Sequence, residues 1–171
     1  MTDEYKDYMS KGREAFVAAD YRKAYEYFNA ALDMVKEFHD RDDGKLHYYW
    51  TQECVFDSLE KMEDYKQAIQ RIDQVIEEEK SKGDSVPQKH MAHFMQRKAC
   101  LEIKSGNSRP GVKLAGEAYD LGFRTKELKT NYEVAAQIWN EHQRGSKVTP
   151  SSLDYWQKSY NYFVADKDLP I

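Results

Sequence analysis

The sequence predicts an all-helical protein built from a helical repeat, and three features support this prediction. Residues that favour helices are abundant, whereas the 171 residues include only 4 Pro and 8 Gly. A pattern of apolar residues recurs at intervals of about 43 residues. Within each recurrence, small and larger residues share one helix face. Together these features indicate antiparallel helical hairpins that stack on one another.

The repeat is clearest in two segments that each contain an Asp-Tyr pair. Ala19–Leu32 and Glu63–Ile76 align with these pairs 44 residues apart, and Gly106–Tyr119 follows with a weaker match. In each segment a small residue is followed by a larger one four positions on and by a small one three positions later. These residues are Ala24, Phe28 and Ala31, then Ala68, Ile72 and Val75, then Gly111, Ala115 and Ala118. Positions i, i+4 and i+7 share one helix face, so we expect this face to pack closely on a neighbouring helix.

The helices that carry this pattern are each expected to begin after a capping residue. Suitable caps are Asp20, Asp64 and Asn107 or Ser108. Their side-chain oxygens can accept a hydrogen bond from a free backbone N–H at the helix start. Another helical run precedes each of these helices. The preceding runs are Asp3–Ala18, Lys45–Met62 and Pro87–Ser105.

A fourth hairpin is expected near the C-terminus, where the pattern is degenerate. A helix is predicted at Asn131–Arg144, a loop at Gly145–Pro150 and a last helix at Ser151–Phe163. Ser151 and Asp154 have the spacing of a capping box at the start of this last helix. Because the last helix is rich in aromatic residues, we expect it to cap the stack or to form a homodimer.

In the first hairpin, Tyr8, Gly12, Ala24 and Phe28 are in turn an aromatic, a small, a second small and an aromatic residue. In this order and at these spacings they resemble the tetratricopeptide repeat. The resemblance implies one domain over 1–171, a right-handed superhelical solenoid with three clear units and a degenerate fourth. The hairpins are expected at about 3–40, 45–82, 87–121 and 125–163, followed by a flexible tail at 164–171.

The same resemblance implies an adaptor or scaffold that binds a peptide or helix of a partner protein. The expected site is the concave groove lined by the first helix of each hairpin. Its candidate residues are Met9, Arg13, Phe16, Trp50, Glu53, Asp57, His93, Gln96, Arg97 and Lys104. Arg13 and Arg97 suit an acidic peptide, but they also suit ion pairs with acidic residues of the groove. The end of the tail, Leu169–Ile171, is a candidate to occupy the protein's own groove. Two alternative functions are a peptide-sensing regulatory module and a dedicated chaperone for a partner protein.

Charge and composition exclude several kinds of partner. The net charge is -4 and no basic run is present, so we do not expect nucleic acid to bind. Neither a long apolar run nor an apolar N-terminal segment occurs, so we expect no membrane span, no signal peptide and a cytoplasmic location. Two cysteines, Cys54 and Cys100, are too few for a disulfide framework and fit a reducing compartment.

No motif of a known catalytic site is present, so we expect no enzymatic activity, no catalytic residue and no cofactor. Glycine-rich phosphate loops, nucleophile elbows and zinc-protease helices are all missing from the sequence. The best candidate for a metal site is the pair His90 and His93, with Cys100 two turns later. A structural zinc site needs a full tetrahedral ligand set, and the neighbouring sequence offers no further ligands. We therefore expect no bound metal.

Overall fold

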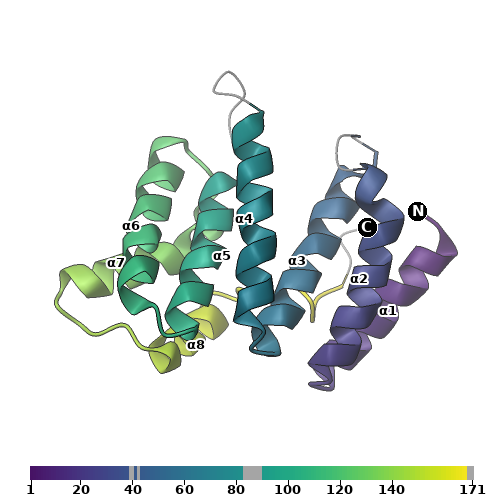
Figure 1. The fold of residues 1–171 in the computed structure, drawn as a ribbon, viewed down its shortest axis with the longest axis horizontal. Coiled ribbons are helices and arrows are strands. Elements are labelled where there is room, and N and C mark those ends of the chain that lie inside the picture. The colour runs from purple at the N-terminus through teal and green to yellow at the C-terminus, as the bar shows by residue number, and fades with distance from the viewer. Residues whose placement is uncertain (39–40, 42, 83–89, 169–171) are drawn as a thin grey trace. The chain divides into compact units, whose positions relative to one another are not determined.

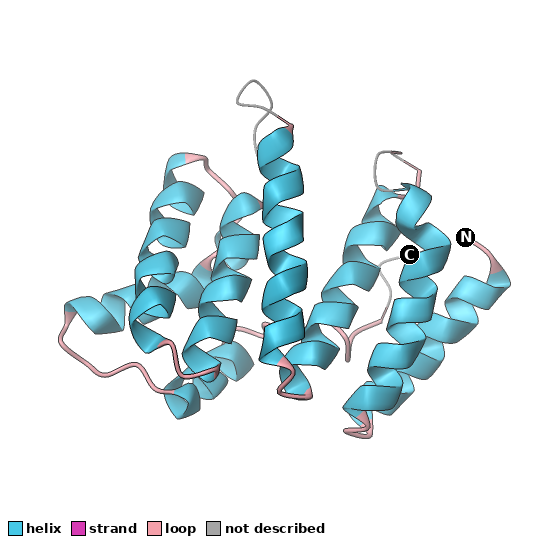
Figure 2. Ribbon diagram, viewed as in Figure 1, coloured by secondary structure: helices cyan, strands magenta, loops and turns pink. Residues whose placement is uncertain are grey.

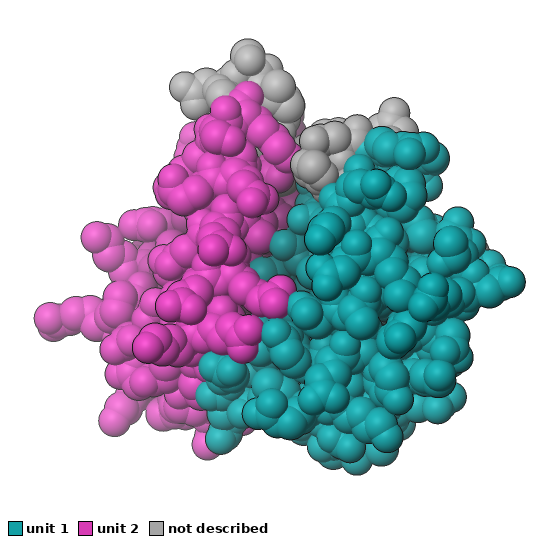
Figure 3. Space-filling model, turned by 45° about the vertical axis from the view of Figure 1, so that its right-hand side comes forward, with its two compact units in different colours: residues 1–64, 163–171 teal, residues 65–162 magenta. Residues whose placement is uncertain are grey.

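The computed structural model describes residues 1–38, 41, 43–82 and 90–168. Within these ranges the chain forms eight α-helices and two short 3-10 helices, and no described residue lies in a strand (Figure 2). The all-helical prediction is therefore confirmed. The chain divides into two compact units, residues 1–64 with 163–171 and residues 65–162, which Figure 3 colours separately. The single domain over 1–171 stays a prediction.

Three helices and the end of the chain form the first unit. The helices are α1 (Asp3–Val17), α2 (Tyr21–Val35) and α3 (Lys45–Lys61), and the 3-10 helix η1 (Lys36–Phe38) follows α2 directly (Figure 1). α1 packs on α2, and α2 packs on α3. The helical runs predicted before Asp20-Tyr21 and before Asp64-Tyr65 agree with α1 and α3 to within a residue at their ends.

The helices α1 and α2 approach each other closely at Gly12. A Cβ atom at this position would lie 2.5 Å from Cε1 of Phe28, so only glycine fits beside this ring. Ala24 and Ala31 lie on the same face of α2 as Phe28, and both are fully buried. The predicted face of small and large residues is thus the packing face of α2. The equivalent residues of the other two segments, Ala68, Ile72, Val75, Gly111, Ala115 and Ala118, are buried as well.

The same tight turn recurs at the repeat spacing. Ala19, Glu63 and Gly106 adopt left-handed φ angles of 60°, 61° and 97° and lie 44 and 43 residues apart. In each turn, the next residue's N–H bonds to the carbonyl five residues back in the preceding helix. The three bonds join Asp20 to Ala15, Asp64 to Leu59 and Asn107 to Glu102, at 2.9, 3.0 and 2.8 Å. This pattern is the Schellman motif, which satisfies carbonyl groups at a helix end and reverses the chain.

The predicted caps differ in how they act. Asp20 accepts a hydrogen bond from the N–H of Lys23 at 3.2 Å, as expected of a cap. Asn107 occupies the capping position of the helix that begins at Ser108, but its side chain makes no capping bond. Its amide instead donates to the carboxylate of Glu102 at 2.9 Å. This bond uses the amide nitrogen, whereas a cap needs the amide oxygen to accept from the first turn, so the cap prediction is wrong at this helix.

Five α-helices form the second unit. They are α4 (Tyr65–Ser81), α5 (Met91–Lys104), α6 (Ser108–Arg124), α7 (Glu133–Gln143) and α8 (Pro150–Ser159), with the 3-10 helix η2 (Lys129–Asn131) before α7. α5 packs on α4 and α6 and also contacts α7 and α8. Leu101 and Ile103 of α5 are fully buried. α5 is therefore the central helix of this unit. The first residues of its predicted run, 87–89, lie outside the described residues.

The last helix begins one residue earlier than predicted and uses a different cap. A capping box forms between Thr149 and Ser152, not between Ser151 and Asp154. The N–H of Ser152 donates to Oγ1 of Thr149 at 3.2 Å, and the N–H of Thr149 donates to Oγ of Ser152 at 2.9 Å. Pro150 then takes the first helical position, where no N–H is needed.

The last helix also ends four residues earlier than predicted. α8 stops at Ser159, whereas the sequence suggested a helix to Phe163. Asn161 adopts a left-handed φ of 54°, and the N–H of Tyr162 bonds to the carbonyl of Gln157 at 2.9 Å. This turn ends the helix and frees the residues that follow it to adopt a non-helical conformation.

Candidate functional site

The segment after this turn, Phe163–Asp168, lies against α1 and α3 in the first unit, and we call it the C-terminal segment. Oδ2 of Asp57 in α3 accepts hydrogen bonds from the backbone N–H groups of Val164 at 2.7 Å and Ala165 at 3.0 Å. Asp57 is fully buried, and Ala165 is only 1% exposed. One buried carboxylate therefore holds two consecutive backbone groups of the segment. In Figure 1 the yellow end of the chain runs beside α3.

Two basic residues hold the ends of the C-terminal segment. Nε of Arg13 in α1 donates to the backbone carbonyl of Asp166 at 3.1 Å, and Nη1 lies 3.3 Å from Oδ1 of Asp168. Nζ of Lys61, at the end of α3, lies 4.4 Å from the centroid of the Phe163 ring, which is a cation–π contact. We call Arg13, Asp57 and Lys61 the docking face.

The C-terminal segment turns sharply while it is bound. The N–H of Lys167 donates to the carbonyl of Val164 at 3.0 Å, so residues 164–167 form a β-turn. Ala165 is the buried corner of this turn, and Asp166 beside it is exposed. The segment thus presents backbone N–H groups to α3, a backbone carbonyl to α1 and a small side chain to the interior. Three of the contacts described above use the backbone of the segment and not its side chains.

The sequence predicted a flexible tail at 164–171, but its described part is bound. The predicted occupant of the groove, Leu169–Ile171, lies outside the described residues, and the bound residues precede it. Lys61 and the segment itself were missed as functional residues. The available signal was the run Phe-Val-Ala at 163–165, an apolar stretch too short to be a helix core and followed by Asp166, Lys167 and Asp168.

The candidate residues on α1 and α3 divide into three groups. Arg13 and Asp57 touch the C-terminal segment, as described above. Met9 and Phe16 are 3% and 6% exposed and belong to the core. The Phe16 ring packs edge-on against Tyr21 with centroids 5.2 Å apart. Core packing explains their burial, because the face of α1 that carries them is turned toward the other helices of the unit. The remaining two, Trp50 and Glu53, are partly exposed.

The candidate residues on α5 are used within the second unit. Oε1 of Gln96 accepts from the backbone N–H of Ala135 in α7 at 3.0 Å, and Gln96 is 1% exposed. Arg97 is fully buried, with its guanidinium 5.2 Å from the Tyr162 ring.

The other two candidates on α5 lie nearer the surface. Nζ of Lys104 pairs with Oδ1 of Asp154 in α8 at 3.0 Å, and the Lys104 side chain is 7% exposed. His93 is partly exposed and packs beside Phe94, with ring centroids 6.0 Å apart. The helices α7 and α8 pack on α5, so residues Gln96, Arg97 and Lys104 contact their own unit. The sequence suggested instead that these residues line an open groove.

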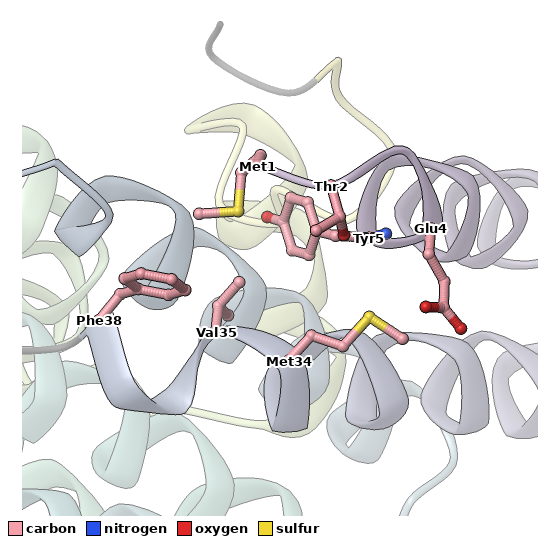
Figure 4. Close-up of a pocket in the computed structure, with 7 residues that line it drawn as sticks. All are labelled: Met1, Thr2, Glu4, Tyr5, Met34, Val35 and Phe38. Atoms are coloured by element: carbon pink, nitrogen blue, oxygen red, sulfur yellow. Dashed lines mark hydrogen bonds between the residues drawn. The ribbon is translucent and has the colours of Figure 1, made fainter.

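An apolar pocket lies where α1 begins and α2 ends. It has a volume of about 540 Å³, and its lining residues are Met1, Thr2, Glu4, Tyr5, Met34, Val35 and Phe38 (Figure 4). The Tyr5 hydroxyl is bound to Oγ1 of Thr51 at 2.9 Å, and burial raises the pKa of this phenol. Beside it, burial and then the N-terminal charge lower the pKa of His47, whose ring contacts Tyr5 edge-on at 5.8 Å. The lining is mainly apolar and suits a side chain better than a polar substrate.

The described residues contain no group of three or more His, Cys, Asp and Glu side chains placed to hold a metal ion. His90 begins α5 with a left-handed φ of 70°, and its Nδ1 lies 3.3 Å from Nδ2 of Asn131. Cys54 and Cys100 are buried and form no disulfide. None of the described helices is long and apolar enough to cross a membrane. On α8, Tyr155 is 69% exposed, and the homodimer through this helix stays a prediction.

No family model matches the chain, and neither does any curated protein or solved structure. The resemblance to tetratricopeptide repeats therefore depends on this chain's own residues. The strongest of these are Gly12 with Phe28 and the three turns that recur at Ala19, Glu63 and Gly106.

Proposed function

We propose that the protein is a tetratricopeptide-like interaction module, folded as a right-handed solenoid of helical hairpins and without enzymatic activity. Two observations support the fold. The same left-handed turn recurs at Ala19, Glu63 and Gly106, at the spacing of the sequence repeat. Gly12 lies directly beside the Phe28 ring, as the small and aromatic positions of such a repeat require.

The proposed activity is binding of a short peptide segment of a partner protein at the docking face, in the role of an adaptor. The observation that carries this proposal is the contact of buried Asp57 with the N–H groups of Val164 and Ala165. A carboxylate that accepts hydrogen bonds from two backbone N–H groups can bind any chain that presents these groups in the same turn. Arg13 adds a contact to a backbone carbonyl and a second to an acidic side chain. Main-chain contacts of this kind supply affinity in peptide recognition, and nearby pockets supply specificity.

A partner protein suits this face better than nucleic acid or a membrane. Asp57 would repel a phosphate group, and a carboxylate at the centre of the site favours N–H donors instead. A polypeptide offers two such donors on neighbouring residues. The two basic residues lie at the ends of the bound segment, where an acidic and an aromatic side chain meet them.

The test is affinity capture with the immobilised full chain, comparing Asp57→Ala with a matched control. The control is Asp33→Ala, which removes a carboxylate of α2 that is 69% exposed and paired with Lys36 of η1. Captured proteins are quantified by mass spectrometry, and circular dichroism verifies that both variants remain helical. We expect a partner to be retained by Asp33→Ala and lost with Asp57→Ala. Equal capture by both variants would show that binding does not use the docking face.

A further inference from the structure

We infer that the C-terminal segment is the protein's own copy of its ligand, and that it must leave the docking face before a partner peptide binds. This inference rests on the proposed function, because it concerns the same site. It adds two things, namely the sequence pattern that the site selects and a competitor built into the chain.

A peptide from another protein can make each contact that the bound segment makes with the docking face. The docking face meets it through two backbone N–H groups, one backbone carbonyl, one carboxylate and one aromatic ring. Each of these groups is available in a peptide from another protein. The helix α8 also ends before the segment, at the turn that contains Asn161. Release of the segment therefore leaves every α-helix hydrogen bond intact.

The contacts define the pattern of the ligand over six positions. The first is aromatic, because Lys61 lies over the ring of Phe163. The third is small, because Ala165 is 1% exposed at the corner of the turn. The sixth is acidic, because Arg13 pairs with Asp168. The pattern over these six positions is therefore aromatic at the first, small at the third and acidic at the sixth.

Burial of the Asp57 carboxylate favours a docking face that is occupied by the C-terminal segment. A charged group that loses water must gain hydrogen bonds, and Val164 and Ala165 supply them. An occupant on the same chain is present at a high effective concentration, of the order of millimolar for a short tether. The fraction of molecules with an open face is then small, and the apparent affinity for any partner falls by that fraction. A partner peptide must therefore match the pattern well or be abundant in order to displace the segment.

The test uses the full chain and a labelled peptide with the sequence of residues 163–171. Ala165→Arg places a large charged side chain where Ala165 is buried, so the chain's own segment can no longer dock while the docking face stays unaltered. Ala165→Ser is the matched control, because serine remains small. Fluorescence anisotropy measures binding of the peptide to each chain, and circular dichroism confirms that each is folded.

We expect Ala165→Arg to bind the peptide at least about tenfold more tightly than the wild type or Ala165→Ser, because the open fraction rises. Adding Asp57→Ala to Ala165→Arg should abolish this binding, and a peptide carrying A165R should not bind at all. Equal affinity of the wild type and Ala165→Arg would overturn the competition, and binding that survives Asp57→Ala would overturn the pattern. Absence of peptide binding to every chain would overturn the inference as a whole. The proposed function is tested separately by the capture experiment. Loss of a captured partner with Asp57→Ala would support that function even if this peptide does not bind.

Discussion

Asp57→Ala should release the C-terminal segment from α3 while α1 and α2 stay folded. The change removes the acceptor of two backbone hydrogen bonds, at 2.7 and 3.0 Å. Hydrogen bonds to a charged group contribute about 1.5–3 kcal/mol each, and these two share one oxygen. We therefore expect docking of the segment to weaken by roughly 2–4 kcal/mol.

Two further contacts of the segment are individually weak. The Arg13–Asp168 pair is exposed, with 44% and 88% of the two side chains accessible, and such pairs contribute about 0–1 kcal/mol. The contact of Lys61 with Phe163 is partly exposed and adds roughly 0.5–1 kcal/mol. Ordering the backbone of each bound residue costs roughly 1–2 kcal/mol. The two hydrogen bonds to Asp57 are therefore expected to contribute more to docking than either of these contacts.

Hydrogen exchange measures this effect directly. In the wild type, the amides of Val164 and Ala165 should be protected, and Asp57→Ala should accelerate their exchange by roughly 30- to 700-fold, which corresponds to the loss of 2–4 kcal/mol. Amides in the centre of α2 should keep their protection, and Asp33→Ala should leave the segment unaffected. If exchange at Val164 and Ala165 does not change in Asp57→Ala, the carboxylate does not hold the segment and the reasoning is refuted.

Three further changes test the fold and its pH dependence. Glu63→Gly should raise the free energy of unfolding by roughly 0.5–1 kcal/mol in urea denaturation, because its left-handed φ of 61° strains any residue with a Cβ. Gly12→Ala should lower the free energy of unfolding by about 1–3 kcal/mol, because the added Cβ meets the Phe28 ring. Stability measured by thermal denaturation should fall as the pH drops below 6.5, the ordinary pKa of histidine, because His47 has a lowered pKa when folded and the unfolded chain takes up the proton first. The loss should level off once the pH is below the folded pKa, and His47→Gln should remove this part of the pH dependence.

Controls separate these effects from general destabilisation. Gly106 occupies the position in its own turn that Glu63 occupies in the preceding one. Gly106→Ala should therefore destabilise the protein, whereas Glu63→Gly should stabilise it. A neutral or stabilising Gly12→Ala would mean that the Phe28 ring moves aside at little cost and that helix propensity decides. An unchanged pH profile in His47→Gln would assign the acid sensitivity to other groups.

Several parts of the fold could be predicted from residue spacing alone. Ala24, Phe28 and Ala31 recur at helical spacing, and burying them requires a partner helix on that face. Gly12 is the small residue of the resemblance, and the space beside Phe28 admits nothing larger. These features are local or repeat along the chain, so a single sequence displays them.

The ends of the last helix show the limit of local inference. Ser151 and Asp154 have capping-box spacing, yet Thr149 and Ser152 form the box, since Pro150 suits the first turn. The stop at Ser159 depends on Asn161 adopting a left-handed angle. Several neighbouring residues can serve as caps with similar energies, and packing of the rest of the helix selects among them.

The sequence by itself determined the helical class and the packing faces of α2, α4 and α6, because these depend on which residues lie one or two turns apart. Only the tertiary structure decided what the polar candidates do. Arg13 and Asp57 bind a segment more than a hundred residues away in the chain, whereas Arg97 is buried beside Tyr162. A charged residue on a helix face has the same local pattern whether it meets a partner, a carboxylate or its own chain end. Its role depends on which distant groups the fold brings within hydrogen-bond distance.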